Sequence, residues 1–425
     1  MSLLLKNITL IHPGSKYNRK KINLLIKDGK IAAIAMRIPK PKNTKVFDYE
    51  GACVSIGWID VGTQVGDPGF EHREDIQSAT RAAVFGGFTG IVCQANTNPT
   101  IHTKSEVLYL KNATSKSIVN FYPLGAVSQS CEGKDLTEMY DMHRAGAVAF
   151  SDGKKSIQDN GLMMRSLQYV KAFNGLIINH PHDDSLAYHG QLHEGIVSTS
   201  LGLKGIPSLA EDMMVQRDIY LAEYAESRLH IANISTVAAV KLVRKAKARG
   251  IKVTASVAAM NLIYTDKVLE EFDVNFKCLP PLREKKDVAA LRRGIEDGTI
   301  DFISSNHTPI EEEVKDREFM YAKFGAIGLE TSFALCNTYL SKKIGLEKLI
   351  ELFAIRPREI LGIEVPQIRK GAIANLTIFH PSEEWIFTKK HIQSKSSNTP
   401  FTGKKFKGKV LGIIANGQTA FVDEL

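Results

Sequence analysis

The chain has 425 residues, of which 44% are hydrophobic and 24% are charged, and its formal net charge at pH 7 is +9. This composition is ordinary for a soluble globular protein, and the length predicts one large α/β barrel with a smaller module beside it. The sequence has no run of 18 apolar residues and begins without a signal-peptide pattern, so we expect a cytoplasmic protein without a membrane span.

The positive charge gathers in two segments, residues 16–42 and 389–409. Because the sequence has no zinc finger, no RNP-like aromatic motif and no long basic helix, we expect no binding to nucleic acid. Solvated surface is the favoured interpretation, and attraction to an acidic partner protein stays open. The five cysteines are widely spaced and include no Cys-x-x-Cys pair, which favours buried, reduced thiols over disulfides or a zinc ribbon.

Both ends of the chain alternate short apolar runs with turn signals. Strand-like runs occupy residues 3–11, 22–35, 45–56 and 374–381, and others follow towards residue 425. Asp28-Gly29 and Asn416-Gly417 predict hairpin turns between neighbouring strands. The two strand-rich ends together predict one small β-sandwich domain, composed of residues 1–56 and 360–425.

The middle of the chain, residues 57–359, alternates strand-like runs with amphipathic helices. The runs include FTGIVCQAN, SIVNFYPLGAV, AVAFSDG, GLIINH, RLHIANI, IKVTASVA and TIDFISSNH. About eight strands with helices between them predict a parallel (β/α)8 barrel of the TIM type. A doubly wound open sheet is the alternative, and it is disfavoured because no Gly-rich phosphate loop follows the first strand. In such a barrel, the chemistry lies at the C-terminal ends of the strands.

Several stretches, in matching order along the chain, carry a resemblance to a known family. They include GWID…DPGFEHREDI, AVAFSDG, GLKGIPSLAEDMMVQRDIYLAE, PPLREKKDVAALRRGIEDGTIDFI and SKSSNTPFTGKKFKGKV. Together they resemble bacterial dihydroorotases of the type related to multifunctional pyrimidine enzymes, amidohydrolases that interconvert carbamoyl-aspartate and dihydroorotate. The resemblance implies a zinc site, because zinc polarises the amide carbonyl and lowers the pKa of its bound water to about 7.

The positions of the family's zinc ligands carry other residues here. The family's first strand ends in Asp-x-His-x-His-x-Arg, and this chain has Gly62 and Gln64 in place of the two histidines. Gly66 replaces the arginine that would grip the substrate carboxylate. The acidic ligand position is Gly153, and a later histidine position is Asn233. Glycine has no ligand atom, and an amide is a poor zinc ligand beside imidazole.

The residues around the end of AVAFSDG and around His180 offer only weak replacements for the missing zinc ligands. Asp152 could be the ligand after a one-residue shift, but strand alternation would point it to the other face. We predict Lys154 and Lys155 to be exposed loop charges rather than a carbamylated ligand. His182, two residues after His180, is a weak candidate for a relocated metal site.

The substrate positions have changed as well. Asn306 replaces the aspartate that acts as general base, and an amide can only hydrogen-bond. Leu279 and Ile310 replace an asparagine and a histidine that lie near the substrate in the family. His193 is predicted to be a polar surface residue. The residual pocket that still matches the family consists of Asn96, His180 and His307, and of these only His180 is a family zinc ligand.

The sequence therefore predicts a dihydroorotase-like protein that is noncatalytic, with no catalytic residues and no cofactor expected. The resemblance makes aspartate carbamoyltransferase the expected partner, since some inactive chains of this kind hold that transferase in an assembled complex. A homo- or hetero-oligomer is expected. The alternative is an active dihydroorotase, or a related cyclic amidohydrolase, that holds zinc in an altered site.

Overall fold

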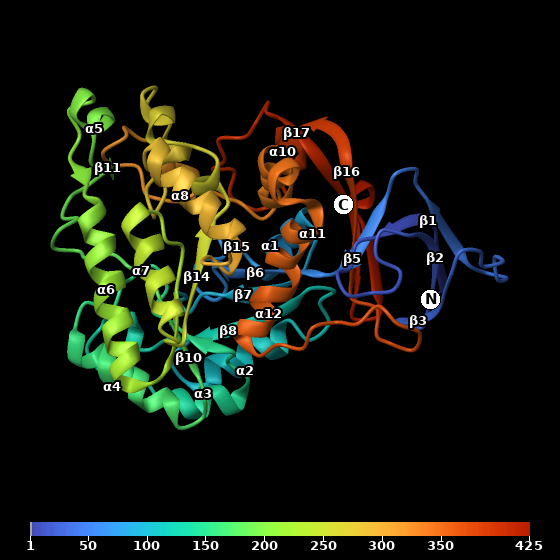
Figure 1. Cartoon of the computed structure of the whole chain (residues 1–425), viewed down its shortest axis with the longest axis horizontal. Helices are drawn as coiled ribbons and strands as arrows, with labels where there is room; N and C mark the ends of the chain where they lie inside the picture. The colour runs from blue at the N-terminus through green and yellow to red at the C-terminus, as the bar shows by residue number, and fades with distance from the viewer. Residues whose placement is uncertain (1) are drawn as a thin grey trace.

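The computed structural model describes residues 2–425, which form a barrel and a second sheet side by side (Figure 1). The barrel strands follow the order β15-β14-β13-β10-β9-β8-β7-β6, and every neighbouring pair is parallel. Their bounds are β6 (Trp58–Thr63), β7 (Phe88–Cys93), β8 (Asn120–Gly125), β9 (Ala149–Phe150), β10 (Leu176–Asn179), β13 (Arg228–Ile231), β14 (Val253–Ala258) and β15 (Phe302–Ser304). The predicted barrel is confirmed.

A buried carboxylate on β6 makes hydrogen bonds that close the barrel between its first strand, β6, and its last strand, β15. Asp60 on β6 accepts hydrogen bonds from the amide nitrogen and the Oγ of Ser305, both at 2.6 Å. The amide of Gln64 also donates to the carbonyl of His307 at 3.1 Å. Burial raises the pKa of Asp60, and the Ser305 and Thr63 hydrogen bonds oppose that rise.

Helices follow the barrel strands and cover the outside of the barrel (Figure 1). They are α1 (Ile76–Gly86), α2 (Lys104–Ala113), α3 (Met139–Ala145), α4 (Asn160–Lys171), α6 (Ser208–Ala225), α7 (Val237–Ala248) and α8 (Lys285–Glu296). After β15 come α9 (Glu312–Lys315), α10 (Ser332–Ile344), α11 (Leu346–Ile350), the π-helical turn η5 (Glu351–Ile355) and α12 (Arg356–Leu361). The start of α1 shows why these helices begin where they do: the Asp75 side chain accepts from the Ser78 amide, and Ser78 Oγ accepts from the Asp75 amide.

An excursion between β10 and α6 interrupts the alternation, and the sequence did not predict it. It contains β11 (Leu192–His193), α5 (Ile196–Ser200) and β12 (Gly205–Ile206), with β11 and β12 paired in parallel. Strands of two residues leave no periodic pattern to detect.

The second sheet draws its strands from both ends of the chain, as predicted. Its order is β18-β17-β16-β5-β1-β2-β3, with β4 paired to β1. The strands are β1 (Ser2–Leu10), β2 (Lys21–Lys27), β3 (Lys30–Ala35), β4 (Lys45–Asp48), β5 (Cys53–Ile56), β16 (Leu376–Ile386), β17 (Lys405–Ala415) and β18 (Gln418–Phe421). Both predicted hairpins are confirmed, because Lys27 lies opposite Lys30 and Ala415 lies opposite Gln418.

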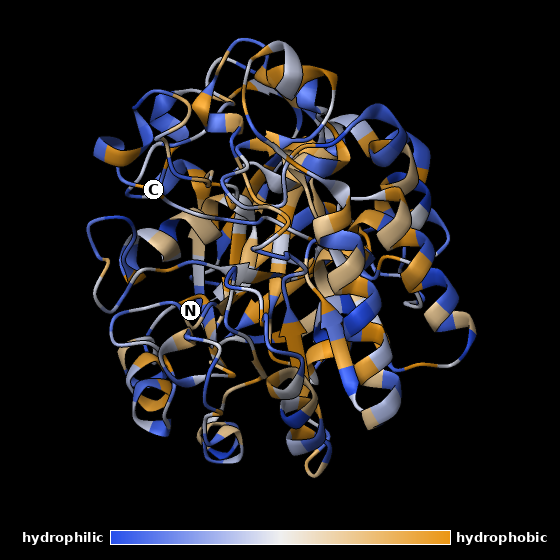
Figure 2. Cartoon of the chain, turned by 90° about the vertical axis from the view of Figure 1, so that its left-hand side faces the viewer, coloured by the Kyte–Doolittle hydropathy of each residue, from blue (hydrophilic) through white to orange (hydrophobic). Residues whose placement is uncertain are grey.

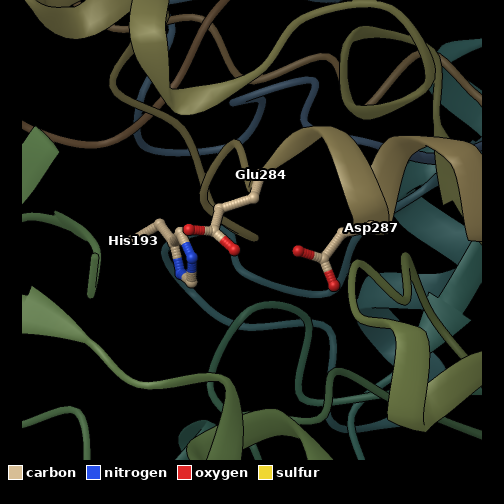
Figure 3. A group of neighbouring side chains, drawn as sticks. All are labelled: His193, Glu284 and Asp287. Atoms are coloured by element: carbon tan, nitrogen blue, oxygen red, sulfur yellow. The ribbon is translucent and has the colours of Figure 1, made fainter. Parts of the chain in front are cut away.

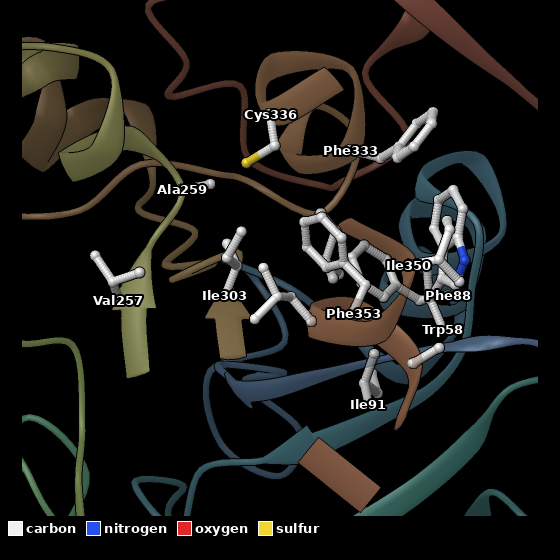
Figure 4. Packing of buried hydrophobic residues seen from close by; sticks show 14 of the residues in the cluster. Trp58, Phe88, Ile91, Val257, Ala259, Ile303, Phe333, Cys336, Ile350 and Phe353 are labelled. Atoms are coloured by element: carbon white, nitrogen blue, oxygen red, sulfur yellow. The ribbon is translucent and has the colours of Figure 1, made fainter. Parts of the chain in front are cut away.

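One aromatic cluster packs the two units together, and Figure 4 shows its rings on the barrel side, among them Trp58, Phe333 and Phe353. Trp58 at the start of β6 is fully buried, and its ring lies 4.4 Å from Phe333 of α10 and 5.3 Å from Phe379 of β16. Phe88 and Phe353 complete the cluster from β7 and η5. Because Phe379 belongs to the second sheet, this contact fixes that sheet against the base of the barrel.

All five cysteines are buried and free, which confirms the prediction of unpaired thiols. Among residues 2–425, no helix is both long enough and apolar enough to cross a membrane.

Candidate functional site

The barrel mouth, where the C-terminal strand ends meet, is built around glycines at the family's ligand positions. Gly66 has φ +80°, and a Cβ added there would lie 2.5 Å from the carbonyl oxygen of Glu74. Gly153 has φ +66°, and its added Cβ would lie 1.7 Å from Oδ1 of Asn96. Gly62 also has a positive φ, of +91°. The backbone has therefore adopted conformations in which the family's side chains are disfavoured.

Restoring an acidic residue in the mouth should destabilise the fold. We expect Gly153→Asp to lower the free energy of unfolding by about 1–2 kcal/mol more than Gly133→Asp. Both glycines have a positive φ, but a Cβ at Gly133 meets no atom within 4 Å, so the control isolates the clash with Asn96. Urea denaturation of the two variants measures the difference, and equal losses would contradict a mouth packed around Gly153.

Two amides, Asn233 at a family ligand position and Asn306 at the position of the general base, are hydrogen-bonded to each other and to neighbouring segments. Oδ1 of Asn233 accepts from Ser304 Oγ at 2.7 Å, and its Nδ2 faces Asn306 Oδ1 at 3.4 Å. Asn306 Nδ2 donates to the carbonyl of Leu279 at 3.0 Å. These bonds leave the mouth with neutral amides where the family has an imidazole and a carboxylate.

His180 follows β10 and retains an unused ring nitrogen. Its Nε2 is buried without a hydrogen-bond partner. Burial, reinforced by the charges of His182 and Lys154, lowers the pKa of His180 to about 3, so the ring is neutral at pH 7. The rings of His180 and His182 are stacked with centroids 6.0 Å apart, which places the weak metal candidate beside the retained one.

Lys154 reaches across the mouth. Its ammonium donates to Thr308 Oγ1 at 2.7 Å. Lys154 follows β9 and Thr308 follows β15, two strands that stand four places apart in the ring of eight. The prediction that Lys154 is an exposed loop charge is therefore wrong, whereas its neighbour Lys155 is exposed as predicted. Burial lowers the pKa of Lys154 to about 8, so it is still mostly a cation at pH 7.

Two small cavities adjoin these side chains. One cavity of about 30 Å³ is lined by Gln64, Gln94 and Asn96 among others, and one of about 20 Å³ adjoins Asn306. Such volumes hold a water molecule, whereas sites for drug-sized ligands usually measure about 300–1,000 Å³. By contrast, a cavity of about 730 Å³ lies at the opposite end of the barrel, against the start of β8.

The other residues of the predicted residual pocket are engaged in the fold. His307 is fully buried; its Nε2 lies 3.2 Å from Glu74 Oε2, and its Nδ1 accepts from the amide of Gly328. Asn96 Nδ2 donates to the carbonyl of Asp152, while its Oδ1 is buried without a partner. Neither ring nitrogen of His307 is free to bind a ligand.

A second group of candidate ligands lies away from these strand ends (Figure 3). His193 on β11, with Glu284 and Asp287 at the start of α8, places one ligand atom from each residue within 4.8 Å of the others. Arg283 Nη1 donates to His193 Nδ1 at 3.0 Å, so the neutral ring carries its proton on Nε2 and has no lone pair for a metal. Asp287 Oδ1 accepts from the amide of Val237. We interpret His193 and Asp287 as side chains held by hydrogen bonds to Arg283 and Val237 rather than as metal ligands.

His193 is only 4% exposed, so its prediction as a surface residue is wrong. Burial, followed by the charge of Arg283, lowers the pKa of His193 to about 4. The sequence carried no signal for this burial, because the partner Arg283 lies ninety positions away in the chain.

Comparison with known proteins places this architecture in a family. A family model described as dihydro-orotase-like matches residues 51–239. The dihydroorotase of Citrifermentans bemidjiense is 39% identical over 423 residues, covering 99% of this chain and 100% of that relative. The dihydroorotase of Pelotomaculum thermopropionicum is 42% identical over 427 residues, covering 100% of both chains. The chain belongs to the dihydroorotase family.

Solved structures share the fold of this dihydroorotase-family protein. L-hydantoinase (dihydropyrimidinase) from Arthrobacter aurescens matches with a TM-score of 0.85 and 24% identity, over 98% of this chain and 95% of that one. A D-hydantoinase matches with a TM-score of 0.83 and 22% identity, over 99% and 95% of the two chains. The barrel and its accompanying sheet are thus an arrangement that this chain shares with these two hydantoinases.

Zinc is the metal that the dihydroorotase resemblance implies, and the residues at the strand ends do not fit it. The four substituted ligand positions are Gly62, Gln64, Gly153 and Asn233, which supply neither imidazole nor carboxylate. Among the described residues at the strand ends, His180 alone offers a buried imidazole nitrogen without a partner, whereas a catalytic zinc normally has three protein ligands. The ammonium of Lys154 adds a positive charge near His180, which opposes a divalent cation.

Proposed function

We propose that this dihydroorotase-family protein is noncatalytic and has a structural or regulatory role, with aspartate carbamoyltransferase as its partner. The proposal is supported by the contrast between a retained family fold and a barrel mouth that keeps only His180 of the family's zinc ligands. The partner is proposed from the resemblance, since some inactive chains of this kind hold that transferase in an assembled complex.

The path of Lys154 is the observation that carries the proposal. The side chain spans the mouth from the β9 side, next to Gly153, to Thr308 on the β15 side, next to the loop that carries Asn306. A substrate carbonyl would have to displace this hydrogen-bonded cation, and no base like the family's aspartate stands at Asn306. Without a bound zinc ion, the mouth has no group among its described residues that could polarise an amide or form hydroxide near neutral pH.

Metal content and turnover test the absence of catalysis. We expect purified protein to contain far less than one zinc per chain, and to hydrolyse dihydroorotate no faster than buffer, with or without added zinc. The dihydroorotase of Citrifermentans bemidjiense, assayed in parallel, serves as the positive control. Stoichiometric zinc together with turnover that chelation abolishes would overturn the proposal.

The partner is tested separately. The tagged chain, expressed in its native cell, is expected to co-purify with aspartate carbamoyltransferase, and mixing the two purified proteins should give a faster-sedimenting complex. If the transferase sediments unchanged at every mixing ratio, the partner is wrong, whatever the metal analysis shows.

The alternative function is an active dihydroorotase, or a related cyclic amidohydrolase, with an altered metal site. The pairing of His180 with His182 is the observation that favours it, because two imidazoles there lie side by side. In that case His180→Ala would abolish both zinc binding and turnover, whereas His193→Ala would leave zinc bound at the mouth.

A further inference from the structure

The cavity of about 730 Å³ lies at the N-terminal end of the barrel, which is the end opposite the mouth. One of its walls consists of the first residues of β8, 120–123, with Val148 beside them. The other wall is the irregular segment 362–375, drawn in orange in Figure 1, which connects α12 to the second sheet. We call this space the basal cavity. Its volume lies within the range of about 300–1,000 Å³ that is usual for sites of small organic molecules.

A packed apolar plug separates the basal cavity from the mouth. Leu124, Ile178 and Phe302 of the barrel strands form one buried cluster with Ile360 and Leu361 of α12. Figure 2 shows hydrophobic residues gathered on the central strands of the barrel. A molecule in the basal cavity therefore does not touch the mouth, so binding there does not depend on zinc or on catalysis.

Neutral hydrogen-bonding groups lie on the inner side of the basal cavity. Tyr122 is half-buried there, and Asn375 is held by a hydrogen bond that its Oδ1 accepts from Thr89 Oγ1 at 2.7 Å. Because Oδ1 is engaged with the buried Thr89, the Nδ2 of Asn375 remains as a donor towards the cavity. No residue of the range 2–425 makes a hydrogen bond to the Tyr122 phenol. These two side chains can therefore bind the polar edge of a ligand.

A buried guanidinium adds positive charge behind this inner side. Arg358 of α12 is 2% exposed, and it donates to the carbonyls of Gly57 and Ala354, each at 2.6 Å. Its Nη2 lies 3.4 Å from Thr89 Oγ1, the hydroxyl that also holds Asn375. All of these partners are neutral, and no carboxylate among the described residues pairs with Arg358. The positive charge therefore stays uncompensated and favours an anion nearby.

The rim of the basal cavity carries two cations and one acid. Lys111 of α2 and Arg369 of the connecting segment come from the two different walls, and both are exposed. Within the described part of the chain, Arg369 forms no ion pair. Glu364 is the acid on the same rim. The basal cavity thus has neutral donors at depth and a positive balance of charge at its opening.

We propose that the basal cavity binds a small organic anion with a flat, hydrogen-bonding ring, the chemistry of a nucleoside monophosphate. The ring lies between Val148 and Ile363, with its polar edge on Tyr122 and Asn375. The phosphate stays at the rim, where the guanidinium of Arg369 can donate two parallel hydrogen bonds to it. Such a ligand matches the cavity in volume and in the order of its polar and charged groups.

Isothermal titration of the intact chain at low salt tests the site, with AMP and UMP as probes. We expect at least one of them to bind once per chain, and the preference between them tells a purine ligand from a pyrimidine one. The matching nucleoside should bind about tenfold more weakly, because it lacks the charge. Raising the salt from about 50 mM to about 500 mM should weaken the nucleotide and leave the nucleoside unchanged. No binding of either nucleotide, or equal binding of inorganic phosphate, would overturn the proposal.

Three variants and a matched control locate the binding. Arg369→Gln should weaken nucleotide binding about tenfold, whereas Glu364→Gln, which removes the acid from the rim, should tighten it. Tyr122→Phe should weaken nucleotide and nucleoside by the same factor, because the phenol contacts the ring. Lys370→Gln is the control, since Lys370 is the exposed neighbour of Arg369 but does not line the cavity. Equal effects of Arg369→Gln and Lys370→Gln, or weaker binding by Glu364→Gln, would place the ligand elsewhere and refute the site.

Discussion

Arg283→Met is expected to lower the free energy of unfolding by about 3–5 kcal/mol, because it breaks a buried ion pair from one side. The guanidinium is 2% exposed. It donates to Ser235 Oγ and to the carbonyl of Ile206, each at 3.0 Å, and it lies 3.4 Å from Glu211 Oε2. These contacts join the β11–β12 excursion, α6 and the loop after β13 at one point.

The loss is large because Glu211 would be left buried without its cation. Burial already raises the pKa of Glu211, and the charge of Arg283 is the largest influence that opposes the rise. Without Arg283 the carboxylate must either stay charged in an apolar surrounding or take up a proton. Glu211 also accepts from the amides of Ser235 and Thr236, so it cannot simply turn to solvent.

Arg244→Met is the matched control. Arg244 also pairs with a carboxylate, Asp297 at 2.6 Å, but both side chains are 44% exposed. Exposed pairs contribute about 1 kcal/mol or less. Chemical denaturation measures both variants, and Arg283→Met combined with Glu211→Gln should recover part of the loss. Equal effects of Arg283→Met and Arg244→Met would show that the buried pair has no special role.

The elements that the sequence predicted are those whose signals are local. Asp28-Gly29 and Asn416-Gly417 force tight turns through their own backbone preferences, whatever surrounds them. The barrel strands were visible because buried parallel strands are continuous apolar runs. The substitutions at the mouth could be recognised because each lies within a contiguous stretch of the family pattern. The left-handed backbone at these positions, as at Gly153, could not be recognised from the sequence.

What the sequence missed depends on packing between distant segments. Lys154 and Lys155 are neighbours of the same type, yet one crosses the barrel and the other is exposed. The local sequence does not distinguish the two lysines, because the acceptor Thr308 is 154 positions away. Helix α6 is apolar on two faces, and only the fold decides that Val215 is buried while Met213 is exposed.

Lys154→Met is expected to raise the free energy of unfolding by about 2 kcal/mol at pH 7. Burial lowers the pKa of Lys154 from 10.5 to about 8. At about 1.4 kcal/mol for each pKa unit, holding the charged form in the mouth costs up to about 3 kcal/mol. Loss of the hydrogen bond to Thr308 removes about 1 kcal/mol of stabilisation, which leaves the net gain.

The gain should depend on pH in a defined direction. Below pH 8 the ammonium is protonated in both the folded and the unfolded chain, so the full penalty applies. Between pH 8 and 10.5 the unfolded chain binds more protons at this group, so the stability of the native protein rises with pH. Lys154→Met should lose that rise, and the two unfolding curves should approach each other by pH 10.

Lys155→Met is the matched control, since Lys155 is exposed and should change stability by less than about 0.5 kcal/mol at either pH. If Lys154→Met is less stable than the native protein at pH 7, then a negative charge or further hydrogen bonds must stabilise the lysine cation in the mouth. A bound anion would be one means of compensation, and isothermal titration with dihydroorotate would then detect it. A stabilised Lys154→Met that remains inactive would indicate that removal of the lysine alone does not rebuild the site.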